Sequence, residues 1–181
     1  MTEHDPLRFP TGPFDPKPSL THAERDDLME ELAHFPADLR FLAMSLTPEQ
    51  LETPYRKDGW TVRQVVHHMP DSHMQGYVRF KLAMTEDKPT IKTYAQAPWG
   101  ETEDTRTAPV EISLDLLDAL HKRWVLFLRS LGDEDFQQTY MHPELGELSL
   151  ETTLQLYVWH GKHHLGHIKL VADAHGLKRP F

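Results

Sequence analysis

Residues 149–176 constrain the fold most, because they combine a long amphipathic helical pattern with histidines at helical spacing. An α-helix places residues four apart on one face, so His160 and His164 are stacked neighbours. On a helical wheel His164 lies inside the apolar arc and His160 at its edge, whereas His163 lies far round toward solvent. Two imidazoles at this spacing make half of a metal site, which a partner helix must complete.

A second histidine cluster lies on the helix expected over residues 61–84. The apolar stripe of this helix has His73 at its centre, whereas His68 is roughly 120° away and His67 slightly further. The periodicity therefore favours His73 as the partner of the C-terminal pair. Pro70 predicts a distorted helix, which keeps His67 and His68 as alternatives. We expect a metal ion bound between the two helices.

Capping signals and apolar periodicity predict four long helices. Capping boxes at residues 21–24 and 61–64 open the first two helices, whose apolar patterns reach Ala43 and Met84. A threonine followed by proline within residues 47–50 predicts one short turn between them. The helices are thus expected to be joined by short connections in this half of the chain.

Prolines and glycines predict where these helices bend or end. Pro36 and Pro70 lie inside the first two patterns, where proline removes a backbone hydrogen bond, so we expect a kink or a break at Pro36 and a bend at Pro70. The third helix is expected to run from Ser113 as N-cap to a stop at Gly132, and the fourth occupies residues 149–176.

These patterns predict an all-α four-helix bundle, formed by residues 1–181 as a single domain. No convincing sheet is expected beyond a turn or small hairpin within residues 136–148. Residues 1–18 contain five prolines and are expected to form an extended arm that packs along the body of the protein.

Residues 86–112 are polar and read as a long irregular loop. Loops of this length in compact domains commonly act as lids or as binding segments. Tyr94 and Trp99 supply large rings within it, and either ring could cover a pocket.

The composition limits the classes of function. Cysteine is absent, which excludes disulfides, zinc–thiolate sites and a cysteine nucleophile. The formal net charge of −9 disfavours a nucleic-acid partner. No apolar run approaches the roughly 20 residues of a membrane span, and the N-terminus lacks the pattern of a signal peptide. We therefore expect a cytoplasmic protein without membrane contact.

Several motifs resemble the YfiT branch of the DinB superfamily, in order and across nearly the whole chain. They are TPYRKDGWTVRQVVHH (residues 53–68), DSHM (71–74), YVRFKL (77–82), LHKRW (120–124), HPE (142–144) and YVWHGKHH (157–164). This resemblance implies an up-down-down-up four-helix bundle, a homodimer and a divalent metal held by three histidines. The ligands that it implies are His68, His160 and His164, so it favours His68 over His73.

The resemblance also implies an activity, that of a metal-dependent hydrolase acting on a small molecule. One divalent ion per chain is expected, with zinc first and nickel as the alternative. Three imidazoles leave an open position for water or substrate. The runner-up is a metal-dependent S-transferase that joins a low-molecular-weight thiol such as bacillithiol to electrophiles. A non-enzymatic alternative is a metal-stabilised scaffold or dimerisation module.

Other polar residues near the motifs receive weaker expectations. Asp71 is a candidate acid or base, and Arg79 and Lys81 are candidates for holding an anionic group. Each of the three also fits a solvated helix face, so none is assigned a catalytic role. His163 and His167 are expected to be hydrogen-bonded residues and not ligands. The same holds for the isolated histidines, which are His4, His22, His34, His121, His142 and His175.

Overall fold

The chain folds almost entirely as helices. A computed structural model describes residues 5–177. Its α-helices are α1 (His22–Met44), α2 (Pro48–Leu51), α3 (Val62–Thr85), α4 (Gln96–Trp99), α5 (Glu103–Thr107), α6 (Val110–Leu128) and α7 (Leu150–Ala174). A 3-10 helix, η1 (Asp135–Gln137), precedes an antiparallel hairpin of β1 (Thr139–His142) and β2 (Gly146–Ser149). Among the described helices, none has the length and apolar character that a membrane crossing requires.

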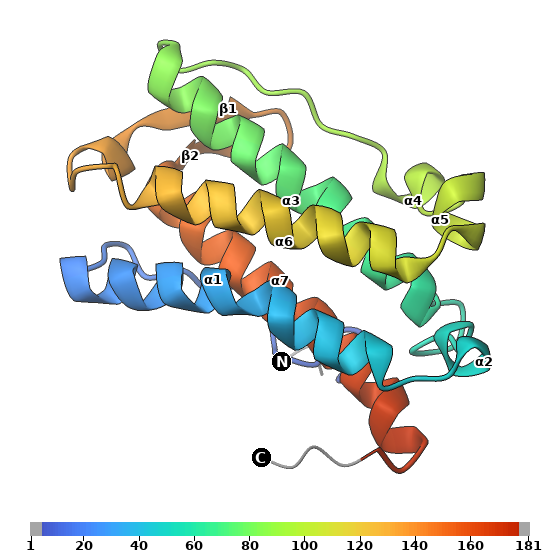
Figure 1. Cartoon of the computed structure of the whole chain (residues 1–181). Helices are drawn as coiled ribbons and strands as arrows, with labels where there is room; N and C mark the ends of the chain where they lie inside the picture. Colours follow the sequence, from blue (N-terminus) through green and yellow to red (C-terminus); the bar gives the residue numbers. More distant parts are fainter. Residues whose placement is uncertain (1–4, 178–181) are drawn as a thin grey trace.

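The four long helices α1, α3, α6 and α7 form the bundle. Figure 1 shows α1 and α7 running in one direction and α3 and α6 in the other, which is the up-down-down-up order. Each helix packs chiefly against two neighbours, so the order around the bundle is α1, α6, α3, α7. The predicted all-α four-helix bundle is confirmed, and α3 lies directly against α7.

The helices begin at the predicted caps. The Thr21 hydroxyl accepts from the backbone N–H of Glu24, whose carboxylate accepts from the Thr21 backbone N–H at 2.8 Å. Thr61 opens α3 with the same reciprocal arrangement. Thr47 and Ser149 cap α2 and α7 through their hydroxyls. These side chains satisfy backbone donors that the first turn of a helix leaves unpaired.

Neither α1 nor α3 is broken at its internal proline. Helices α1 and α3 continue through Pro36 and Pro70, and both prolines are buried. Packing on neighbouring helices stabilises a helix more than one lost hydrogen bond weakens it. The sequence signal for a break is therefore overridden by the bundle.

Helix α6 begins before Ser113 and ends before Gly132, so both predicted boundaries are wrong. Pro109, with φ fixed at −59°, precedes the first turn in place of a side-chain cap. Ser113 lies inside the helix, where its Oγ is 2.7 Å from Nδ1 of His67. Its hydroxyl connects α6 to α3 and does not cap a helix.

Residues 86–112 are not the irregular loop that was predicted, because they carry α4, α5 and the first turn of α6. Gln64 on α3 donates to the carbonyl of Gly100 at 2.8 Å, and the Gly100 backbone packs on the ring of Trp60. Ile91 is buried beside the hairpin. The segment therefore covers a face of α3 that the other three long helices leave open.

The N-terminal arm lies along α7, as predicted, over the described residues 5–18; residues 1–4 of the predicted arm lie outside the described part. Nε1 of Trp159 donates to the carbonyl of Gly12 at 3.2 Å. The ring of Phe14 packs against the same tryptophan at a centroid distance of 5.7 Å. The arm thus shields one side of α7 from solvent.

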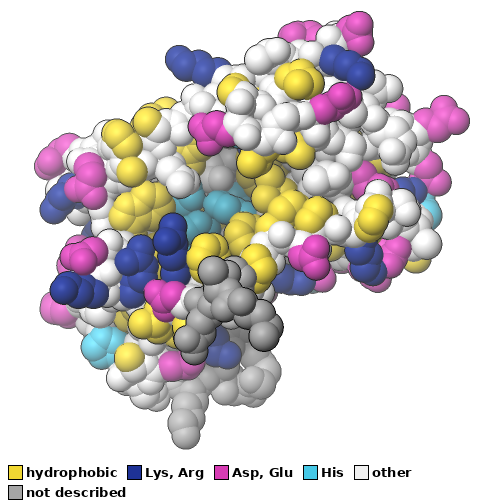
Figure 2. All heavy atoms as spheres, turned by 180° about the vertical axis from the view of Figure 1, so that it is seen from behind, with side chains coloured by type: hydrophobic (Ala, Val, Ile, Leu, Met, Phe, Trp, Pro, Cys, Tyr) yellow, Lys and Arg dark blue, Asp and Glu magenta, His cyan; other side chains and the backbone are white. Residues whose placement is uncertain are grey.

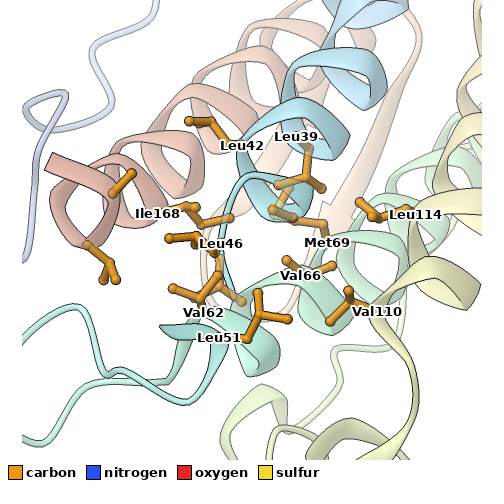
Figure 3. Packing of buried hydrophobic residues seen from close by; sticks show 14 of the residues in the cluster. Leu39, Leu42, Leu46, Leu51, Val62, Val66, Met69, Val110, Leu114 and Ile168 are labelled. Carbon is orange, nitrogen blue, oxygen red and sulfur yellow. The ribbon is translucent and has the colours of Figure 1, made fainter. Parts of the chain in front are cut away.

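Two clusters of buried apolar side chains fill the bundle. Figure 3 shows the first, in which leucine, valine, methionine and isoleucine side chains from α1, α2, α3, α6 and α7 lie together. The second lies toward the hairpin, around Trp124 and Tyr140. The ring of His73 touches both clusters, since it stacks on Phe35 at 5.3 Å and meets Trp124 edge-on at 6.1 Å. A layer of histidines therefore crosses the bundle between the clusters.

Gly76 allows α3 to approach two large rings beside this layer. A Cβ at this position would lie 2.5 Å from Cζ of Tyr157 and 2.6 Å from Cη2 of Trp124. We expect Gly76→Ala to lower the free energy of unfolding by about 1–3 kcal/mol, because overpacking displaces buried side chains. Urea unfolding followed by circular dichroism measures this. Gly132→Ala is the control, since its nearest contact would be at 3.7 Å; equal losses in both variants would contradict the prediction.

Candidate metal centre

Three imidazoles meet between α3 and α7. His68 projects from α3, and His160 and His164 project from successive turns of α7. One nitrogen atom of each ring lies within 4.8 Å of the other two, and Nε2 of His68 is 3.3 Å from Nε2 of His160. His68 and His164 are only 4% and 8% exposed. The structure thus brings together the three residues that the family resemblance implied.

A chain of hydrogen-bonded histidines runs from this group into the core. Nδ1 of His160 lies 3.2 Å from Nε2 of His73. Nδ1 of His73 lies 2.8 Å from Nε2 of His121, and Nδ1 of His121 lies 2.7 Å from the carbonyl oxygen of Leu32. His73 and His121 are 0% and 1% exposed, so water does not compete for these hydrogen bonds.

The Leu32 carbonyl sets the direction of every hydrogen bond in this chain. It can only accept, so neutral His121 carries its proton on Nδ1 and accepts at Nε2. His73 then donates from Nδ1 and accepts at Nε2, which requires His160 to donate from its own Nδ1. His160 is left with its lone pair on Nε2, the atom that faces His68.

The other two imidazoles are oriented in the same way. Nε2 of His167 donates to the carbonyl oxygen of Arg8 at 3.2 Å, so Nδ1 of His167 accepts. Its partner is Nδ1 of His164 at 3.3 Å, which leaves the lone pair of His164 on Nε2. Nδ1 of His68 lies 3.3 Å from the hydroxyl of Tyr94, which can accept its proton. All three rings can thus offer Nε2.

The donor set fits a divalent transition metal. Nitrogen lone pairs facing each other across 3.3 Å repel unless a cation lies between them. Burial lowers the pKa of His68 to about 4 and holds the pKa values of His160 and His164 well below their usual range, so at neutral pH protons do not fill this role. Three neutral imidazoles supported by outer hydrogen bonds suit zinc or nickel, whereas calcium and magnesium prefer oxygen.

Two cavities reach the candidate centre, one at His160 alone and the other at His160 and His164. One has a volume of about 490 Å³ and the other about 410 Å³. His160 lines both, as do Gln96 and Ala97 of α4, so the two spaces meet at the candidate centre. Figure 2 shows histidine side chains at the floor of a hollow with apolar side chains around it and Lys or Arg side chains on one rim. Cavities of this size accept small molecules.

The structure separates the other histidine candidates of α3 from the centre. His67 turns toward α6, where Nδ1 lies 2.7 Å from Oγ of Ser113 and Nε2 lies 3.1 Å from the carbonyl oxygen of Ala108. His73, which the helical wheel favoured, forms the chain behind His160 instead of joining the three converging rings. Its central position on the stripe correctly indicated burial, and the preference for it as the partner of the C-terminal pair is not supported.

The wheel misplaced His68 because it assumed a single buried stripe. Residues 64–70 are all buried, since α4 and α5 cover the side of α3 that the bundle leaves open. Helix α3 also runs through Pro70 without interruption, so a broken helix does not account for the position of His68. The error thus comes from reading residues 86–112 as an irregular loop.

One further expectation for the histidines is wrong. His163 was placed toward solvent, yet it is 9% exposed because Trp159 stacks on it at 4.8 Å and Phe9 of the arm lies 6.0 Å away. His121 is hydrogen-bonded, as expected, and its two hydrogen bonds anchor the buried chain of histidines. Its position within the apolar stripe of α6 was the signal that it is buried.

Of the three charged candidates, Arg79 is the one that lines a cavity at the centre. It lines the 490 Å³ cavity together with His160, whereas Asp71 and Lys81 are not among the residues that line either cavity. Burial, with a contribution from nearby Asp104, raises the pKa of Asp71 to about 6. Lys81 instead places its ammonium group over an aromatic ring at 3.9 Å.

Tyr94, one of the two rings expected to cover a pocket, lines this same cavity. Its ring packs against that of Trp99 at 4.8 Å, and Trp99 itself is 40% exposed. Burial raises the pKa of the Tyr94 hydroxyl to about 12, so the hydroxyl keeps its proton at neutral pH.

Comparison with known sequences gives relatives that match most of the chain. The profile of the DinB superfamily matches residues 31–168. A Bacillus cereus (strain B4264) protein named "Putative metal-dependent hydrolase" is 50% identical over 162 residues, which are 90% of this chain and 93% of that protein. A Bacillus mycoides (strain KBAB4) protein of the same name is 49% identical with the same coverage.

A solved structure has the same fold. YfiT from Bacillus subtilis, described as a probable metal-dependent hydrolase with an unusual four-helix bundle topology, matches with a TM-score of 0.93 and 42% sequence identity. The match covers 96% of this chain and 100% of that one. Sequence profile, relatives and fold agree, and the chain belongs to the DinB superfamily.

Proposed function

We propose that the protein is a metal-dependent hydrolase that acts on a small molecule through one divalent ion held by His68, His160 and His164. The observation that carries this proposal is the convergence of three Nε2 lone pairs, each directed by a hydrogen bond at Nδ1, where two cavities meet. The names of the relatives support the hydrolase class. Zinc is the first choice and nickel the alternative, since both accept imidazole ligands.

The residues around the centre define what it could do. Three protein ligands leave at least one coordination position open, as in catalytic sites. When bound, the ion supplies a Lewis acid that polarises a substrate carbonyl or phosphoryl group and lowers the pKa of water. The carbonyls of Leu32 and Arg8 keep the imidazole protons on the outer nitrogens. Tyr94, which retains its own proton, can donate a hydrogen bond into the cavity.

A second candidate activity is transfer of a low-molecular-weight thiol such as bacillithiol to an electrophile. The observation that favours it is the presence of two cavities that meet at His160, because transfer needs room for two substrates beside one metal. Hydrolysis needs only one organic substrate. Turnover of an electrophilic substrate with and without added thiol separates the two activities.

The cavities also bear on the non-enzymatic alternative. A metal-stabilised scaffold needs no opening to solvent at the metal, whereas both cavities reach His160. This arrangement supports an enzyme over a scaffold. The homodimer and the cytoplasmic location stay predictions from the sequence.

Elemental analysis tests the proposed centre directly. The protein is purified without a His-tag or a nickel column, together with His68→Ala, His160→Ala and His164→Ala. We expect about one zinc or nickel per chain in the parent and loss of the metal from each variant, since two imidazoles hold a divalent ion far less tightly than three.

His163→Ala is the matched control, because it removes an equally buried imidazole next to His164 that has no hydrogen bond to the three rings. It should retain the metal. A parent protein free of metal, or a ligand variant with full occupancy, would refute the three-histidine assignment.

A further inference from the structure

Among the described residues 5–177, two arginines are buried, and only one of these two has a counter-ion. Arg25 is 5% exposed and forms ion pairs with Asp133 at 2.7 Å and Glu151 at 2.8 Å. Arg79 is 9% exposed, and within residues 5–177 no carboxylate forms an ion pair with it. Its Nη1 donates to the hydroxyl of Tyr157 at 3.1 Å, and its Nε is buried without a hydrogen-bond partner.

An unpaired buried charge is costly to a folded protein. Removing a charge from water is compensated only when an opposite charge or several hydrogen bonds replace the solvent. Arg25 meets this condition with two carboxylates, whereas Arg79 has hydroxyl groups around it. Within residues 5–177 no carboxylate supplies this compensation, so a bound anion is the natural partner for Arg79.

The position of Arg79 indicates where such a partner would bind. Arg79 lines the 490 Å³ cavity that also reaches His160. The carboxylate-bearing residue of this lining is Glu144, which is exposed and forms no ion pair with Arg79. The guanidinium group thus faces the space that a substrate would occupy beside the candidate metal centre.

His142 offers a second donor on the same wall. Its Nδ1 accepts from the backbone N–H groups of Glu144 and Leu145, both at 3.2 Å. A neutral imidazole that accepts at Nδ1 carries its proton on Nε2, so His142 can donate from Nε2. His142 lines the cavity together with Arg79. The wall therefore combines a cation and an N–H donor.

We propose that Arg79, assisted by His142, binds an oxyanion of the substrate, either a carboxylate or a phosphate, and holds the reacting part of the substrate beside His68, His160 and His164. Arginine suits this role because its planar guanidinium pairs with two oxygens at once. The inference rests on the proposed function and adds the substrate class to it. The substrate is then an anionic small molecule whose charged group is remote from the bond that reacts.

Isothermal titration of the metal-loaded protein with inorganic phosphate and with succinate tests the proposal. We expect Arg79→Met to lower the affinity for the more tightly bound of the two anions at least about tenfold, because a pair of charge-assisted hydrogen bonds is lost. Arg79→Lys should weaken it less. Lys81→Met is the matched control, since it removes a positive charge from the same helix outside the cavity and should bind like the parent. The preferred anion identifies phosphate or carboxylate as the recognised group.

The stability of the variants distinguishes an arginine that binds substrate from one that only supports the fold. Without added anion, Arg79→Met should leave the urea midpoint unchanged or raise it, because it removes an unpaired buried charge. Arg25→Met should lower the midpoint, because it leaves Glu151, which is 4% exposed, without its partner. A fall in the Arg79→Met midpoint as large as that of Arg25→Met would assign Arg79 a structural role.

Two further results would overturn the proposal, namely equal anion affinity in Arg79→Met and the parent, or no anion binding by the parent at millimolar concentration. Metal content measured on the same samples separates this failure from failure of the proposed function. A parent that holds its metal but shows no Arg79-dependent anion binding refutes only the oxyanion site. A parent without metal refutes the hydrolase centre, whatever the anion titration shows.

Discussion

Lowering the pH from 7 to 4 is expected to unfold the protein, because the folded state buries several histidines in their neutral form. Burial lowers the pKa values of His121 and His167 to about 4, from an ordinary value of 6.5. The unfolded chain binds protons at these groups below pH 6.5, whereas the folded chain does not until about pH 4. Stability is therefore full above pH 6.5 and falls progressively toward pH 4.

The size of this effect makes it the dominant acid response. A shift of this size at fully buried His121 is worth about 3 kcal/mol. The buried residues His73, His160 and His164 add to it in the same direction. Asp71 acts in the opposite direction, because its pKa is raised to about 6 and its protonation favours the folded state as the pH falls. One half-buried carboxyl group does not offset several buried imidazoles, so the free energy of unfolding decreases as the pH falls.

Urea midpoints at pH 7, 6, 5 and 4, followed by circular dichroism, measure this slope. His121→Gln should reduce the loss of stability between pH 6.5 and 4 by the contribution of the His121 imidazole. The same substitution should also lower the stability at pH 7. His34→Gln, at an exposed position on α1, is the control and should follow the parent. A midpoint that stays constant down to pH 4 would show that the buried histidines do not govern acid stability.

The sequence predicted the parts of the protein that local rules control. Thr21, Thr61 and Ser149 cap helices because their hydroxyls replace missing backbone partners within one turn. The spacing of His160 and His164 placed both imidazoles on one face of a helix for the same local reason. Helix positions and the C-terminal histidine pair could therefore be read from neighbouring residues alone.

The remaining features depend on contacts between distant segments. His68 faces α7 on a stretch of α3 that is buried on all sides, because α4 and α5 fold over it from residues 86–112. His121 lies 48 positions after His73 and meets it only because α6 packs on α3. No periodicity within one helix contains this information, and only the family resemblance favoured His68 over His73.

His121→Phe is expected to weaken zinc binding by about 10–100-fold, the usual consequence of losing a hydrogen-bond partner behind a metal ligand. Phenylalanine fills the space but offers no acceptor at the position of Nε2. His73 would then bury the N–H of its Nδ1 without a partner unless it moves that proton to Nε2. A proton on Nε2 of His73 points at Nδ1 of His160, which must then accept and cannot carry a proton. The proton of His160 moves to Nε2 of His160, where it blocks the lone pair offered to the metal.

Competition for zinc against a fluorescent chelator measures this affinity without any assay of activity. His73→Phe should have an effect of similar size, and the double variant should be little worse than either single one, because both substitutions interrupt the same chain. His163→Ala, which removes an imidazole that packs on His164 without a hydrogen bond to it, should bind zinc like the parent. Parent-like affinity in His121→Phe would mean that His160 keeps its lone pair on Nε2 without the Leu32 carbonyl at the far end of the chain. Additive losses in the double variant would mean that His73 and His121 act on the metal site independently and not through one chain.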